Sequence, residues 1–210
     1  MKYILYLLIL MIPLTACKKT PKLSVKKELK NTTTAAFEVD STGVPVDPNI
    51  NYFPLELDSA KVPFFSKMLF AMYEPVLYDC KMDKESYRFL WLRTVKNPVA
   101  IRLEKIKDTV IMYIKVTTGQ GGVAPGRLKV SDSKVLTAKE WNEFSELIKQ
   151  CDFWNMPALD NEKKISGEQW IMEGYKKDDY NLTEIWNPEL DDALRKACEY
   201  LLNVSGVPTN

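Results

Sequence analysis

The sequence contains 210 residues with a formal net charge of +1, and it contains no histidine. The balanced charge argues against a nucleic-acid partner, which requires a concentrated basic face. The absence of histidine excludes Ser-His-Asp and Cys-His catalysis, histidine-ligated zinc and haem, and the HExxH metalloprotease motif. We therefore predict neither a metal centre nor a bound cofactor.

The first 16 residues have the three parts of a secretory signal. Lys2 supplies the positive start, residues 3–14 are apolar, and Thr15 and Ala16 are small. The apolar stretch is shorter than the roughly 20 residues that a helix needs to cross a membrane. We therefore predict a signal peptide over residues 1–16.

A cysteine directly follows the small residues. The stretch from Leu14 to Cys17 resembles the lipobox of bacterial lipoproteins. This resemblance implies that Cys17 carries a lipid that holds the protein to the membrane. It also implies outer-membrane anchoring, because Lys18 replaces the aspartate that is typical of inner-membrane retention. An ordinary signal peptide, or a short anchor, is the alternative.

Residues 17–57 show neither a helical nor an alternating pattern, and prolines recur in their second half. We predict a lipidated flexible tether over 17–57 and a single globular domain over 58–210. The lysines from Lys18 to Lys30 could bind anionic headgroups, although a solvated linker is the favoured interpretation. Asp40-Ser41-Thr42 resembles a bacterial O-glycosylation acceptor.

The globular region opens with a helical pattern that Pro75 ends near Glu74. Period-two alternation then predicts four strands, in YRFLWLRT, PVAIRLEK, TVIMYIKVTT and GRLKV. In the second strand Arg102 and Glu104 are expected to point outward. The third is apolar on both faces, which favours a central position in the sheet.

The helix that follows has a well-marked start. Thr137 and Glu140 form a capping box, and Leu136 and Trp141 have the spacing of a hydrophobic staple. Two more strands are predicted in EQWIMEGYK and YNLTEIW, joined by a polar turn.

Asn187 is then predicted to cap a final helix that begins at Pro188, with Leu190 on its buried stripe. The order of elements predicts an α+β fold, a mainly antiparallel sheet of about six strands with two to three helices packed on it.

Gly121 and Gly122 lie in the glycine-rich stretch TTGQGGVAPG. Its backbone amides could cradle an anion or grip a partner. The stretch lacks the end of a P-loop, so a wide hairpin connection is the favoured interpretation.

Glu173 and Glu184 lie on two strands that we expect to be neighbours. A carboxylate pair of this kind could perform general acid–base chemistry or glycoside hydrolysis. A solvated face, or salt bridges to arginines such as Arg88, Arg93 or Arg102, is the favoured alternative.

Arg88 and Arg93 stand among aromatic residues and could form an anion pocket or cation–π contacts, or could bridge strand edges, which we favour. Trp91 and Trp170, with Trp186, could form an exposed aromatic platform, but large aromatics at strand spacing are more often in the core.

Cys80, Cys151 and Cys198 allow at most one disulfide and leave one thiol over. Cys151 and Cys198 fall on the apolar faces of predicted helices. Burial as small hydrophobic residues is at least as well supported as a bridge between the helices.

The stretches YRFLWLRT, NPVAIRLEK, FWNMP, GEQWIMEG and IWNP resemble a family of uncharacterised bacterial envelope proteins over about residues 64–206. That resemblance implies one compact domain and assigns no activity. We predict a lipid-anchored protein that binds or scaffolds another envelope component, a protein or a glycan. The alternatives are a carboxylate-dependent enzyme acting on envelope glycans and an inhibitor of an envelope-attacking enzyme.

Overall fold

The computed structural model describes residues 37–54, 57–58, 60–78, 83–158, 167–177 and 179–209. The elements in chain order are α2 (Lys61–Ala71), β1 (Glu85–Arg93), β2 (Val99–Ile106), β3 (Thr109–Thr117), β4 (Leu128–Leu136), α3 (Ala138–Gln150), the short 3₁₀ helix η2 (Phe153–Asn155), β5 (Glu168–Lys176), β6 (Asp179–Trp186) and α4 (Ala193–Ser205). Within these ranges, no helix is long and apolar enough to cross a membrane.

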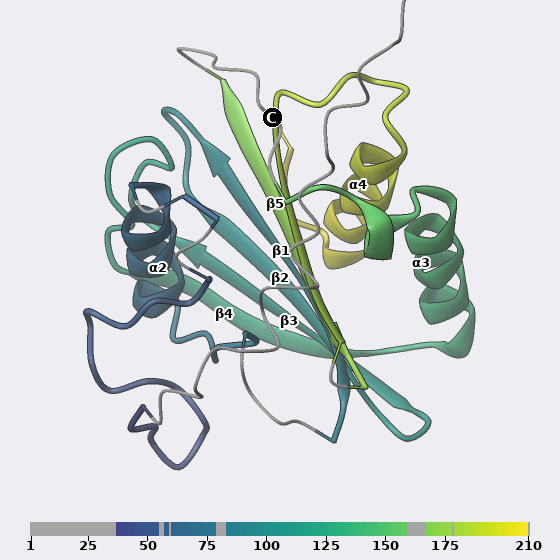
Figure 1. Ribbon diagram of the computed structural model, residues 1–210, viewed down its shortest axis with the longest axis horizontal. Helices are drawn as coiled ribbons and strands as arrows, with labels where there is room; N and C mark the ends of the chain where they lie inside the picture. Colours follow the sequence, from purple (N-terminus) through teal and green to yellow (C-terminus); the bar gives the residue numbers. More distant parts are fainter. Residues whose placement is uncertain are drawn as a thin grey trace, which may run out of the picture.

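The strands form one sheet in the order β4-β3-β2-β1-β5-β6, and every neighbouring pair is antiparallel. Helix α2 lies on one side of this sheet, and α3 and α4 lie on the other (Figure 1). The described part of the chain is therefore an α+β fold with a six-stranded antiparallel sheet and three α-helices, which confirms the predicted fold class.

The sheet has an apolar core on each face because side chains alternate along a strand. On β1, Phe89 and Trp91 face α3 and α4, whereas Leu90 and Leu92 face α2. The two central strands β1 and β2 are consequently buried on both faces over most of their length. Strand β3 is one position from the edge rather than central.

The end of the segment that the sequence predicts as tether packs into the domain. Tyr52 and Phe53 are fully buried in the α2-side core. The Tyr52 hydroxyl donates to the Glu74 carbonyl oxygen at 2.8 Å, and its backbone N–H donates to Ser66 Oγ at 3.0 Å. The Phe53 and Phe65 rings meet edge-to-face at 6.1 Å. Tyr52 and Phe53 therefore pack against α2, and the centre of the Tyr52 ring also lies 5.7 Å from the guanidinium carbon of Arg88 on β1.

Helix α3 begins as its sequence predicts. The Thr137 hydroxyl accepts from the Glu140 N–H at 3.2 Å, and the Glu140 carboxylate accepts from the Thr137 N–H at 2.7 Å. Leu136 and Trp141 are both buried in the core on that side. The capping box is thus confirmed.

The predicted start of the last helix is wrong. Helix α4 begins at Ala193, where the Asp192 carboxylate accepts from the N–H groups of Leu194 and Arg195. Asn187 instead adopts a left-handed conformation and accepts from the Glu168 N–H, and Leu190 is exposed. The Asn-Pro pair therefore belongs to the loop after β6, and aspartate supplies the cap.

Candidate functional site

Glu173 and Arg88 belong to a buried chain of alternating charges on the α2 side of the sheet. Arg88 is fully buried, and its guanidinium donates to a Glu173 oxygen and to the Pro75 carbonyl oxygen. Glu74 lies between the two arginines, 3.4 Å from Arg88 Nη1 and 2.7 Å from Arg102 Nε. We call this set the ionic chain; its members in order are Glu173, Arg88, Glu74, Arg102, Glu104 and Lys84.

The ionic chain corrects the expectation that Arg102 and Glu104 point into solvent, because both are buried. Burial raises the pKa of the Glu173 carboxyl, whereas Arg88 and a hydrogen bond from Tyr180 act in the opposite direction. Three acids and three bases compensate one another, so this cluster resembles a structural network more than a reactive one.

Glu184 lies on the same face of the sheet as Glu173, since Glu173 is paired with Leu182 and Glu184 with Ile171. Its carboxylate forms a 2.8 Å ion pair with Lys61 at the start of α2. The two predicted carboxylates therefore share a face, but each is buried and has its own cation. Neither lines the two grooves described below.

Gly121 and Gly122 pack against the turn between β1 and β2. Their N–H groups donate to the carbonyl oxygens of Lys96 and Thr94 at 2.9 and 3.2 Å. A Cβ atom at Gly121 would lie 2.6 Å from the backbone nitrogen of Arg93, so only glycine allows this close approach. These two amides are occupied, and their role here is to hold the loop to the turn.

Trp91 and Trp170 are in the core rather than on an exposed platform, each with 3% of its surface accessible. Their rings lie 5.6 Å apart, and both indole N–H groups donate to the same Glu168 oxygen, at 2.8 and 3.1 Å. Arg195 of α4 lies over the Trp170 ring.

Arg93, at the end of β1, is the buried cation that differs from the others. It is 7% exposed, and its guanidinium carbon lies 3.8 Å from the centre of the Trp91 ring. Nη1 makes a long 3.5 Å contact to the Thr209 carbonyl oxygen, and Nε has no hydrogen-bond partner. Among the described residues no carboxylate lies within salt-bridge distance, and burial lowers the pKa of this guanidinium, with Glu168 opposing.

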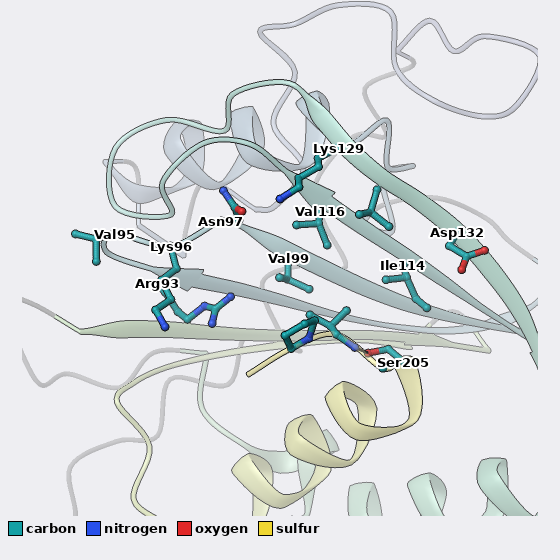
Figure 2. Close-up of a pocket in the computed structure, with 14 residues that line it drawn as sticks. Arg93, Val95, Lys96, Asn97, Val99, Ile114, Val116, Lys129, Asp132 and Ser205 are labelled. Atoms are coloured by element: carbon teal, nitrogen blue, oxygen red, sulfur yellow. Dashed lines mark hydrogen bonds between the residues drawn. The ribbon is translucent and has the colours of Figure 1, made fainter. Parts of the chain in front are cut away.

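Arg93 lines a groove of about 610 Å³ on the α4 side of the sheet, which we call the Arg93 groove (Figure 2). One wall is the β1–β2 turn with Lys96 and Asn97, and the opposite wall is β4 with Lys129 and Asp132. The apolar floor comes from β2, β3 and β4: Val99, Ile114, Val116 and Val130.

The segment after α4 forms the last wall of the Arg93 groove. Gly206 ends the helix in a left-handed conformation, and Val207 packs on the core. Residues 206–208 also border a second groove of about 630 Å³, the tryptophan groove, which contains Trp170, Glu168 and Glu199. The chain thus separates two neighbouring grooves that share one wall.

Sequence reasoning found Arg93 but missed Lys96, Lys129 and the 206–208 wall. Periodicity marks which residues alternate on a strand, but it does not show that α4 ends short of β4 and leaves part of the sheet uncovered. The available signal was the polar sequence Lys129-Val-Ser-Asp-Ser-Lys134, which is typical of an exposed strand.

The cysteines form no disulfide within the described residues. Cys17 and Cys80 lie outside the described residues, and Cys151 and Cys198 are free thiols. Within the described ranges, no cluster of three or more acidic or cysteine side chains is arranged to hold a metal ion.

Comparison with known protein families finds no match for this chain, and comparison with curated proteins finds no significant relative.

Proposed function

We propose that the folded domain is the binding module of a lipid-anchored bacterial envelope protein, and that it binds an anionic, partly apolar envelope component in the Arg93 groove. The anchoring part of this proposal rests on the sequence from Leu14 to Cys17. The ligand part rests on Arg93. A buried guanidinium without a compensating carboxylate is costly, and an incoming anion would supply the missing partner.

The surroundings of Arg93 support an anion with an apolar body. Lys96 and Lys129 are exposed on opposite walls, and neither forms an ion pair within the described chain. Asp132 is the acid among the lining residues, and its carboxylate accepts from the Ser133 N–H. The apolar floor suits a hydrocarbon or an aliphatic side chain, and the volume is that of ordinary ligand sites, roughly 300–1,000 Å³.

The glycan alternatives receive less support from the geometry. Trp91 and Trp170 expose little surface for stacking on a sugar, and both indole N–H groups are bound to Glu168. Glu173 and Glu184 each have a cation of their own. An enzyme would need one of these carboxylates in an accessible groove with a substrate.

The test is calorimetric titration of residues 17–210 carrying Cys17→Ser, which lack both the apolar leader and the lipidation site, with octanoate and with octanol. Octanoate should bind, and octanol should bind at least tenfold more weakly, because only octanoate has a carboxylate that can pair with the Arg93 guanidinium. Arg93→Gln should weaken octanoate binding about tenfold or more, since a hydrogen bond to a charged group contributes about 1.5–3 kcal/mol.

Lys115→Gln is the matched control, because it removes the same charge from the opposite face of the sheet, where Lys115 pairs with Ala100. Its octanoate affinity should equal that of the parent chain. Equal binding of octanoate and octanol, or full affinity in Arg93→Gln, would exclude the groove as an anion site.

A further inference from the structure

Strand β4 is an exposed edge of the sheet. Its residues from Lys129 to Ser133 are all accessible to solvent, so neither helix layer covers them. Its ladder runs only to β3, and within the described residues no other backbone hydrogen bond reaches it. A nine-residue strand held on one edge alone is a ready template for another strand.

The other edge of the same sheet is treated differently. Strand β6 is covered by the segment after α3: the Glu184 N–H donates to the Ala158 carbonyl oxygen at 3.0 Å, and Thr183 Oγ1 donates to the Pro157 carbonyl oxygen at 2.8 Å. Within the described residues, the chain therefore caps the β6 edge with its own backbone and leaves the β4 edge uncovered.

We propose that β4 pairs antiparallel with β4 of a second copy of this chain, around a two-fold axis at Ser133. Such an axis is perpendicular to the sheet and continues it, so residues that oppose one another must lie on the same face. This restricts the possible pairings to those centred on a residue of the strand.

Charge decides among the available centres. A centre at Asp132 would oppose two aspartates, and a centre at Lys134 would oppose two lysines, both of which are destabilising. A centre at Ser131 would place Asp132 opposite Val130, so it would form no ion pair there. A centre at Ser133 places Asp132 opposite Lys134 of the second copy, and by symmetry does so twice.

The same register covers exposed apolar surface. Val135 is 67% exposed and would lie opposite Ser131 of the second copy, and Val130 would lie opposite Leu136. Within one chain, Lys134 Nζ lies 3.5 Å from a Glu140 carboxylate oxygen. In the dimer, Lys134 would contact both Glu140 of its own chain and Asp132 of the second copy. Because Asp132 also lines the Arg93 groove, pairing neutralises the acid at that wall.

Disulfide trapping tests the register in residues 17–210 carrying Cys17→Ser. Ser133→Cys should give a cross-linked dimer under mild oxidation, because directly opposed Cβ atoms lie about 4.5–5.5 Å apart. Ser131→Cys should stay at the level of the parent chain, whose own thiols set the baseline, because its two copies would be about 13 Å apart. Equal trapping at both positions, or none at Ser133→Cys, would overturn the pairing.

A charge exchange tests it without cysteine chemistry, by sedimentation velocity over a range of concentrations. Asp132→Lys should raise the dimer dissociation constant roughly tenfold, because it creates two lysine–lysine oppositions. Adding Lys134→Asp to the same chain should restore the dimer. A parent chain that is monomeric at all concentrations, or a double variant that does not recover, contradicts the proposal.

Discussion

Arg88 and Arg93 are both buried on β1, and their side chains lie on opposite faces of the sheet because their positions along the strand differ by five, an odd number. Arg88 faces α2 and contacts the carboxylates of Glu74 and Glu173. Arg93 faces α4 and contacts the Trp91 ring, but within the described residues it has no carboxylate partner. One arginine is thus paired with carboxylates, and the other has none within the described residues. Removing Arg88 should therefore lower the free energy of unfolding, whereas removing Arg93 should not.

Replacing Arg93 with methionine should not destabilise the fold. Methionine keeps the contact with Trp91 and removes a poorly compensated buried charge, so the free energy of unfolding should stay equal or rise by up to about 2 kcal/mol. Octanoate binding should be lost in the same variant. Urea unfolding of the variant and its parent, with calorimetry on both, measures the two effects. A loss of more than about 1 kcal/mol would make Arg93 a structural residue.

Replacing Arg88 with methionine should be strongly destabilising. The substitution leaves the Glu74 and Glu173 carboxylates buried without their shared cation, which costs about 3–5 kcal/mol. Adding Glu173→Leu should recover part of the loss, because it removes the carboxylate that is left without a cation, whereas Glu74 keeps its ion pair with Arg102. Chemical denaturation of the single and double variants measures the coupling between the residues.

Lys149→Met is the control for the Arg88 experiment. It breaks an ion pair with Glu146 in which both side chains are mostly exposed. The free energy of unfolding should change by no more than about 0.5 kcal/mol. If Arg88→Met behaves like this control, the ionic chain contributes little to stability.

The folded segment before α2 gives a third prediction. Tyr52→Ala should lower the free energy of unfolding by about 3–5 kcal/mol, because it empties a fully buried site between α2 and the Glu74 carbonyl. Tyr52→Phe should lose only about 1 kcal/mol for the hydroxyl hydrogen bond. Val46→Ala, at a half-exposed position, serves as the control. Thermal unfolding with Tyr52→Ala unchanged would mean that this segment is a tether after all.

The prediction of Tyr52 as tether shows where sequence reasoning stops. Local signals worked well: alternation predicted the strand that carries Phe89 and Trp91, and the Thr137–Glu140 capping box located the start of α3. Residues 37–54 have no periodicity, and the burial of Tyr52 depends on contacts with Ser66 and Glu74, 14 and 22 residues further along the chain.

The candidate site was even less predictable, for the same reason. Alternation gives the side of a strand on which Arg88 or Arg93 lies, but not which distant segments cover it. Glu173 reaches Arg88 only because β5 inserts beside β1, and the chain after α4 reaches Arg93 from the C-terminal end of the described residues. Both contacts span more than seventy residues of sequence.

Buried thiol and phenol groups make the free energy of unfolding depend on pH in the alkaline range. Burial raises the pKa of the Cys151 thiol from 9.0 to about 11, and it raises the pKa values of Cys198, Tyr52 and Tyr180 above their ordinary ranges. A group whose pKa is higher in the folded state holds its proton there after the unfolded chain has released it. Its contribution to stability is therefore complete below the unfolded pKa and decreases as pH rises toward the folded pKa.

The free energy of unfolding should therefore show no loss from these groups up to about pH 8 and should fall steadily above about pH 9. Replacing both Cys151 and Cys198 with alanine should remove the earliest part of this fall, because thiols have the lowest ordinary pKa of the set. Urea titrations at a series of pH values between about 7 and 11 measure how the free energy of unfolding of both chains depends on pH. Parallel slopes would mean that the thiols ionise in the folded state as readily as in the unfolded chain, and that their burial between α3 and α4 has no electrostatic consequence.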